Sequence, residues 1–199
     1  APMRSVVSSE EIPGYTRVSE VLRYFAEPGL VDWMIRKGPE AKKLAKQAMK
    51  VGTEVDIAIK TFIIERKWPK VKTSEATSCV DGFKRWYDDY KPNLRVGKRL
   101  FNEEFMVTGE PDLYLGDRII DIKCAREIRP KYHIQTGAYA WLDDKSATGI
   151  LRLHKALSDY QYTERNGNDV VEDKEIFLLM FKTYRYFNKY NAENKQSGF

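Results

Sequence analysis

Apolar residues recur every three or four positions over most of residues 16–91, which is the spacing of amphipathic helices. The pattern predicts a short helix that Thr16 or Ser19 caps, and a second that ends at Gly38-Pro39. A long helix follows through residue 63, in which Gly52-Thr53 indicates a kink, a split or a close helix contact. A fourth helix, capped by Thr73 or Ser74, ends near residue 92.

From residue 94 onward the pattern changes to short runs of β-branched and aromatic residues. Residues 94–107 predict one or two strands, and residues 107–123 predict two strands joined by a tight turn at Gly116-Asp117. A helix beginning at Pro130 precedes strands at residues 148–153 and 160–162, and Asp173 is expected to cap a last helix. Residues 1–15 and 188–199 are predicted to be irregular.

These elements predict an α/β (α+β) fold in one domain, residues 1–199. Residues 1–92 would form a mostly helical part, and residues 93–187 would form the catalytic sheet and its helices.

Three charged residues interrupt the apolar hairpin at residues 107–123: Asp112, Asp121 and Lys123. Residues two apart on a strand share a face, so Asp121 and Lys123 project together, and the hairpin partner can bring Asp112 beside them. Such burial is costly unless a cation binds there. The acid-x-Lys spacing itself is common, since it also begins at Glu40, Glu65, Asp89, Asp143, Glu172 and Glu193, on predicted helices or polar loops.

This set of residues suits metal-assisted phosphodiester hydrolysis. Mg²⁺ or Mn²⁺ prefers oxygen ligands, which the Asp112 and Asp121 carboxylates and the Ile122 carbonyl would supply. One or two ions would activate water, and Lys123 would orient that water or stabilise charge on the phosphate. The alternative is an internal salt bridge between Asp121 and Lys123, with Asp112 as a hairpin residue.

Composition adds few constraints. With 42% hydrophobic and 32% charged residues the chain has a globular composition, and its longest apolar run, residues 176–181, is too short to span a bilayer. Two cysteines, Cys79 and Cys124, indicate neither disulfides nor a zinc or iron–sulfur cluster, which points to the cytoplasm or another reducing compartment such as an organelle matrix. No signal peptide is expected. A net charge of +5 favours a polyanionic partner.

Three motifs that follow one another along the chain resemble those of a known family. Gly109-x-x-Asp112, Asp121-x-Lys123 and Gln135-x-x-x-Tyr139 occur in the order typical of the PD-(D/E)XK nuclease superfamily, and are most similar to its RecB-like branch of phage, CRISPR-associated and mitochondrial genome maintenance exonucleases. The likeness covers about residues 15–155 and includes upstream segments at residues 16–22, 28–33 and 52–56. It implies a restriction-endonuclease-like core, in which a central mixed sheet is flanked by helices and carries an N-terminal helical cap.

The chain departs from the family at three points. Asp56 stands where the family presents His; it would be a third metal ligand, or a solvated helix residue. Asp121 stands where many members use Glu. The cysteine ligands of the iron–sulfur branch are absent, so no cluster is expected.

The resemblance also implies roles around the metal. Gln135 and Tyr139 lie four apart on one helix face and would place the phosphate backbone, although Tyr139 alone reads as a core aromatic. His133 is either a substrate contact or structural, and Glu110 either an outer acid or a polar loop residue. Phosphate contacts are expected from Arg17, Arg126, Arg129, Lys131 and Tyr139, with further candidates at Arg23, Lys42, Lys43 and Lys46.

The sequence therefore predicts a Mg²⁺- or Mn²⁺-dependent DNA exonuclease that acts on single strands or duplex ends with little sequence specificity. A structure-selective endonuclease of the same superfamily and a catalytically inactive nucleic-acid-binding module stay open as alternatives. Polarity, preference for DNA over RNA, pathway and assembly into a homo-oligomer, as in ring-forming phage relatives, also stay open.

Overall fold

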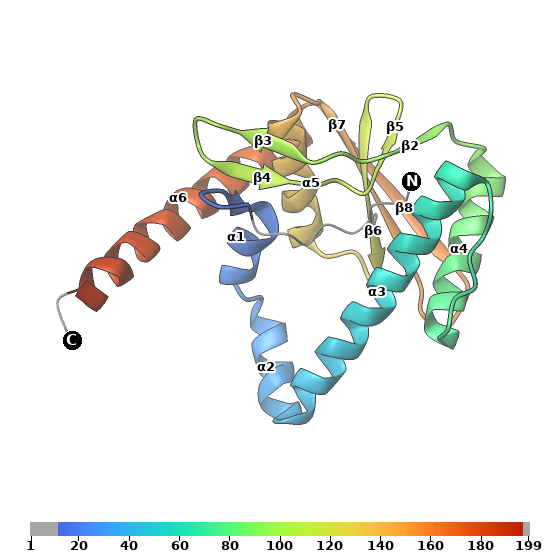
Figure 1. The fold of residues 1–199 in the computed structure, drawn as a ribbon, viewed down its shortest axis with the longest axis horizontal. Coiled ribbons are helices and arrows are strands. Elements are labelled where there is room, and N and C mark those ends of the chain that lie inside the picture. The colour runs from blue at the N-terminus through green and yellow to red at the C-terminus, as the bar shows by residue number, and fades with distance from the viewer. Residues whose placement is uncertain (1–11, 197–199) are drawn as a thin grey trace.

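The structure, a computed structural model, describes residues 12–196, which form six helices and eight strands in two mixed sheets (Figure 1). The larger sheet has five strands in the order β2-β5-β6-β7-β8, and only its β6–β7 pair is parallel. Its strands are β2 Leu94–Val96, β5 Leu113–Leu115, β6 Arg118–Cys124, β7 Ala147–Leu153 and β8 Tyr160–Asn166.

The smaller sheet has the order β1-β4-β3, with a parallel β1–β4 pair and an antiparallel β3–β4 pair. Its strands are β1 Thr16–Arg17, β3 Leu100–Asn102 and β4 Val107–Gly109. The helices are α1 Val18–Tyr24, α2 Pro28–Lys37, α3 Glu40–Glu65, α4 Ser74–Tyr90, α5 Pro130–Leu142 and α6 Asn168–Gln196. The predicted α/β class, with a mixed sheet flanked by helices and a helical N-terminal part, is confirmed.

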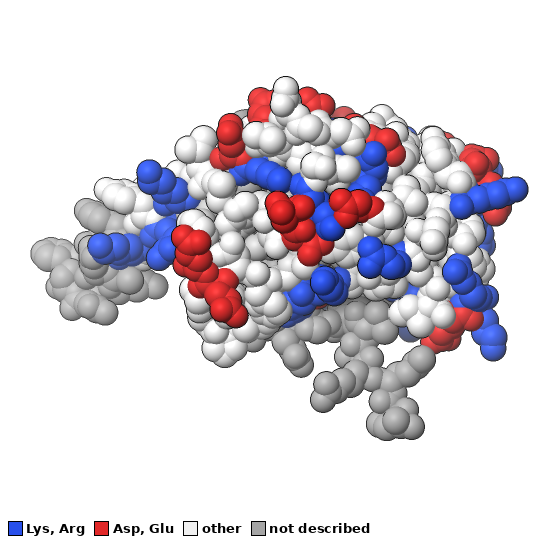
Figure 2. Space-filling model, turned by 90° about the horizontal axis from the view of Figure 1, so that it is seen from above, with Lys and Arg blue, Asp and Glu red and all other residues white. Residues whose placement is uncertain are grey.

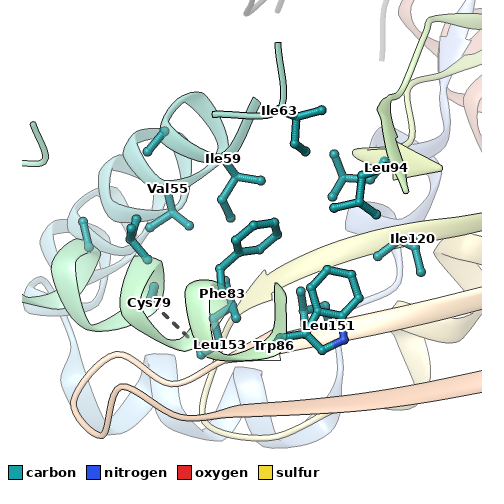
Figure 3. Packing of buried hydrophobic residues seen from close by; sticks show 14 of the residues in the cluster. Val55, Ile59, Ile63, Cys79, Phe83, Trp86, Leu94, Ile120, Leu151 and Leu153 are labelled. Atoms are coloured by element: carbon teal, nitrogen blue, oxygen red, sulfur yellow. Dashed lines mark hydrogen bonds between the residues drawn. The ribbon is translucent and has the colours of Figure 1, made fainter. Parts of the chain in front are cut away.

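Helices cover both faces of the larger sheet, each over its own apolar core. On one face α3 and α4 pack against the strands, and Figure 3 shows Phe83 of α4 next to Ile59 of α3, and Trp86 of α4 next to Leu151 of the sheet. On the other face α1, α5 and α6 enclose a second core that includes Ile119 of β6. The two central strands β6 and β7 are therefore largely shielded from water, whereas the edge strands β2 and β8 are partly exposed.

Strand β6 lies at the centre of this arrangement, as the sequence predicts. Ile120 and Ile122 face the core under α3 and α4, whereas Ile119 faces the core under α5. Alternation along the strand puts Asp121 and Lys123 on the α5 face with Ile119. The predicted turn at Gly116-Asp117 is confirmed, because Gly116 has a positive φ of 58° and β5 pairs antiparallel with β6.

Helix α3 is a single continuous helix, so a split at Gly52-Thr53 is wrong. Close helix packing does not explain Gly52 either, because a Cβ built there meets no atom within 4 Å. The cost of one glycine in a helix is only about 1 kcal/mol, and burial of Val51 and Val55 beside it offsets that cost.

Several predicted helix ends need correction. Thr73 caps α4 by accepting a hydrogen bond from the Ala76 amide, as expected. Neither Thr16 nor Ser19 caps α1, because residues 16–17 form strand β1 and the helix follows it directly.

The last helix also begins and ends elsewhere. It starts at Asn168, and Asp173 is a buried residue inside it that pairs with Arg165 at 2.8 Å. The helix continues to residue 196 and includes most of the tail predicted to be irregular; residues 1–11 and 197–199 of the predicted irregular ends lie outside the described residues. Between residues 12 and 196 no helix is long and apolar enough to cross a membrane.

The backbone at Gly97 lies against the backbone of residues 111–112, the segment that leads into β5. The Gly97 amide donates to the Asp112 carbonyl at 2.9 Å, and a Cβ built on Gly97 would lie 1.8 Å from the Pro111 carbonyl oxygen. That distance is far inside van der Waals contact, and the obstructing atom belongs to backbone, so a side chain at residue 97 would displace residues 111–112.

We expect Gly97→Ala to destabilise the protein by at least about 2 kcal/mol, because the new methyl group overlaps a fixed carbonyl. Urea unfolding measures this, with Gly29→Ala as the control, since a Cβ at Gly29 meets no atom within 4 Å. The control should change stability by less than about 1 kcal/mol. Equal stability of Gly97→Ala and the natural protein would contradict this close contact between the two backbone segments.

Candidate active site

The β5–β6 hairpin separates at the end away from its turn, and this separation creates the site. Backbone pairing runs from Leu115↔Arg118 to Leu113↔Ile120 and stops there. Beyond it, the Asp112 carboxylate takes the place of the missing strand partner and accepts the Ile122 amide proton at 2.6 Å. The hairpin thus brings Asp112 beside Asp121, as the sequence predicts.

The space opened by this separation is the central hollow, a cavity of about 270 Å³. Its walls come from α3, the β5–β6 hairpin and α5, and consist of Gly52, Thr53, Asp56, Asp112, Asp121, Ile122, Lys123, Cys124, Gln135 and Tyr139. Every residue predicted as catalytic or metal-binding lines it. Asp56 reaches it from α3, on the opposite side of the sheet from α5.

Lys123 is held from three sides. Its ammonium lies 2.7 Å from the Asp121 Oδ2 and donates to the Gln135 Oε1 at 2.9 Å. Gln135 in turn donates to the Tyr139 hydroxyl at 2.8 Å, and the Tyr132 ring lies under the ammonium at 5.2 Å. The ammonium therefore has a fixed position, which is a requirement for electrostatic stabilisation of a reaction.

Tyr132 is a site residue that the sequence reading missed. It lies three residues before Gln135 and seven before Tyr139, which is the spacing of one helix face. The Tyr139 ring belongs to the apolar core around α5, as expected of a core aromatic, while its hydroxyl accepts a hydrogen bond from Gln135; its predicted contact with the phosphate backbone stays a prediction. Gly109 allows this position, since a Cβ there would lie 2.7 Å from the Tyr139 ring.

The carboxylates of the central hollow repel one another. Burial raises the pKa of Asp121 to about 7, with Asp112 adding to the rise and Lys123 opposing it. Burial and the nearby Asp112 likewise raise the pKa of Asp56 to about 6, against the opposing charge of Lys60. A cation placed among these groups would relieve the repulsion.

Lys60 is the second residue that sequence reasoning missed. It lies one helical turn after Asp56 on α3, and its ammonium is 3.0 Å from the Asp56 Oδ1. Burial lowers the pKa of Lys60, but Asp56 and Asp112 outweigh this and raise it above the ordinary value. The available signal was a lysine as the one charged residue in the mostly apolar run of residues 57–63, four residues after an acid.

The donor set of the central hollow fits a hard divalent cation such as Mg²⁺ or Mn²⁺. The Asp56 Oδ1 and the Asp121 Oδ2 are buried oxygens that lie within ion-pair distance of an ammonium but make no aligned hydrogen bond. Within residues 12–196 no three His, Cys, Asp or Glu side chains are already gathered closely enough to hold a metal. Lys60 pairs with Asp56 and would compete with a metal ion for that carboxylate, whereas Asp112 accepts the Ile122 amide proton through Oδ2 and has a second oxygen for ligation.

The basic residues predicted to contact DNA have different surroundings. Arg129 pairs with Glu27 at 3.3 Å, and the Lys131 ammonium donates to the Phe25 carbonyl, so both hold the α1–α2 connection against α5. Arg126 is exposed and lines a separate hollow of about 380 Å³ beside residues 154–157. Arg17 lies on β1 opposite Thr108 and does not line the central hollow.

The two remaining candidates, His133 and Glu110, have surroundings that indicate structural roles. Burial lowers the pKa of His133 to about 4, and the residue does not line the central hollow. Glu110 pairs with Arg99 at 3.1 Å, as expected of a polar loop residue. The net positive charge does not gather on the face seen in Figure 2, where basic and acidic side chains are interspersed.

Comparison with known proteins found no matching family model and no matching curated protein. Similar solved structures include a phage-related exonuclease from Haemophilus somnus 129PT, with 16% identity and a TM-score of 0.46 over 90% of this chain and 96% of that one. An alkaline exonuclease from Laribacter hongkongensis shows 11% identity and a TM-score of 0.45 over 91% and 94% of the two chains. A structure of that enzyme with dAMP has 12% identity and the same TM-score.

Removing one partner of the Asp121–Lys123 pair should cost far more than removing both. We expect Lys123→Met to lower the free energy of unfolding by about 3 kcal/mol, because it leaves a buried carboxylate without its counter-ion. The double variant Asp121→Leu/Lys123→Met should recover most of that loss. Urea unfolding of both variants measures this, and a double variant as unstable as the single one would contradict the pairing.

Proposed function

We propose that this protein is a metal-dependent deoxyribonuclease that hydrolyses phosphodiester bonds, most readily as an exonuclease. The observation that carries the proposal is the meeting of Asp112, Asp121 and a fixed Lys123 in one hollow at the separated end of the central hairpin. A purely structural ion pair would not require a second carboxylate or an open cavity beside it.

Asp112 and Asp121, with the Ile122 carbonyl, would hold a Mg²⁺ or Mn²⁺ ion. When bound, the ion supplies an activated water and offsets negative charge on the scissile phosphate. The Lys123 ammonium would orient that water or donate to a phosphate oxygen as charge develops. Gln135 and Tyr139 keep the ammonium in place through their hydrogen bonds.

The DNA backbone would approach along α3. Lys42 and Lys46 are exposed on its first half, and their spacing puts them on the same side as Thr53 and Asp56. This part of α3 and the adjoining α2 extend away from the sheet layers (Figure 1). Contacts of this kind position phosphates without reading bases, which supports low sequence specificity. Arg126 and Arg17 stay candidates for further contacts.

The exonuclease assignment and the preference for single strands or duplex ends rest on the resemblance of the sequence motifs to the RecB-like branch. The ten residues that line the central hollow are spread from Gly52 to Tyr139, which supports one nuclease unit. One observation favours the inactive binding module as a second candidate: Lys60 already pairs with Asp56, the residue at the family's histidine position.

The decisive experiment supplies end-labelled single-stranded DNA, linear duplex and closed circular DNA, each with Mg²⁺, Mn²⁺ or EDTA. We expect release of mononucleotides from linear substrates only with metal, and a loss of at least about 100-fold in Asp121→Asn and Lys123→Met, because each removes a metal ligand or a charge-stabilising group. Lys67→Met is the matched control, since Lys67 belongs to the exposed Glu65-x-Lys67 copy of the same spacing.

Absence of metal-dependent cleavage of any substrate would overturn the nuclease proposal. Cleavage of closed circles would assign an endonuclease, and a mobility shift without cleavage would assign the binding module.

Gly52 keeps a space open on the wall of the central hollow, one helical turn before Asp56. We expect Gly52→Ala to raise the free energy of unfolding by up to about 1 kcal/mol, because alanine suits a helix better than glycine. Nuclease activity should nevertheless fall, because the methyl group enters the substrate path. Gly29→Ala, on α2, is the control for activity, and unchanged cleavage by Gly52→Ala would contradict this role.

A further inference from the structure

Lys60 is the one lysine with a buried side chain among the residues that the structure describes, with 6% of its surface exposed. Lysine ammonium groups are seldom buried, because removing one from water costs several kcal/mol unless nearby negative charges compensate for the lost hydration. The sequence motifs that mark the central hollow do not include this residue. Its presence therefore needs an explanation in the charges around it.

The geometry connects Lys60 to the acids of the central hollow. Asp56 lies four residues earlier on α3 and holds the ammonium at 3.0 Å, within one face of the helix. Asp112 and, more weakly, Glu110 also attract it. Glu110 already pairs with Arg99, so Asp56 and Asp112 are the carboxylates that Lys60 balances.

The charges around the central hollow then show how many cations it accommodates. Three carboxylates line the hollow, Asp56, Asp112 and Asp121, together with the Lys123 ammonium; Lys60 does not line it but pairs with Asp56. The sum of these five charges is one negative charge. One divalent ion and one phosphodiester group bring this sum to neutrality. A second divalent ion would leave an excess of two positive charges in a half-buried space, and it would compete with Lys60 for Asp56.

We propose that the Lys60 ammonium takes the place of a second metal ion, so that this site binds a single divalent cation at Asp112 and Asp121 while Asp56 stays paired with Lys60. The inference rests on the proposed metal-dependent function and adds the number of ions and the role of Lys60. Lys60 acts here as a positioning residue, because it fixes Asp56 and contacts no reacting atom.

The test counts bound Mn²⁺ ions per folded chain, by the loss of the free Mn²⁺ signal in electron paramagnetic resonance. The natural protein should bind one ion. Lys60→Met should bind two, because removal of the ammonium frees Asp56 as a ligand and deepens the negative charge. Lys60→Arg keeps the charge and should stay at one, as should Asp56→Asn/Lys60→Met, which lacks both the ammonium and the additional carboxylate. Lys50→Met, an exposed lysine on the same helix, is the control.

Two ions bound by the natural protein would overturn the inference, as would a single ion bound by folded Lys60→Met. The count on the natural protein needs no variant, so an unfolded Lys60→Met would leave that test intact. No Mn²⁺ bound by the natural protein at any concentration would instead remove the proposed metal-dependent function, together with the inference that rests on it.

Discussion

The hydrogen bond from the Ile122 amide to the Asp112 carboxylate is the interaction on which the site depends. A central strand normally satisfies its amides with a neighbouring strand, and an unpaired buried amide is costly. Here a side chain satisfies the amide, so the strands can separate without leaving it unpaired. The separation exposes Asp121 and Lys123 to a cavity at the end of the hairpin. Gly97 maintains the geometry by holding the backbone of Asp112 from the other side.

Buried charge is the second constraint. A carboxylate with 2% of its surface exposed, as in Asp121, is stable only when other groups share its charge. The protein meets this requirement with paired lysines, Lys123 for Asp121 and Lys60 for Asp56, rather than with hydrogen bonds alone. The pairing holds the acids near one another although burial, and then the charge of Asp112, raises the pKa of Asp121 and of Asp56. An arrangement of this kind is more useful for function than for stability, since apolar residues would pack there at lower cost.

Helix α3 contributes both to the apolar core and to the wall of the central hollow. Its second half, with Val55 and Ile59, packs into the core beside α4, while most of its first half is exposed to solvent. Gly52 lies where the two halves meet and keeps the wall of the central hollow free of a side chain. The apolar stripe predicted along the whole helix is therefore used only over its second half.

The sequence by itself determined the elements whose signals are local. The hairpin turn at Gly116, the Thr73 cap and the central position of β6 follow from turn chemistry, capping chemistry and apolar runs within a few residues. Four residues that line the central hollow were also named from the sequence: Asp112 and Asp121 from their places in the hairpin, and Gln135 and Tyr139 from the resemblance of their motif to the RecB-like branch.

Only the tertiary structure decided which charges meet. Lys60 pairs with Asp56 inside one helix, yet its burial depends on the sheet against which α3 packs, and no local pattern reports that. Arg129 and Lys131 are predicted phosphate contacts, and folding brings residues 25–27 against them from about 100 positions away in the chain. Ion pairing depends on the distance between two charges in space. It leaves no repeating pattern in the sequence, so the order of residues does not show which charges pair.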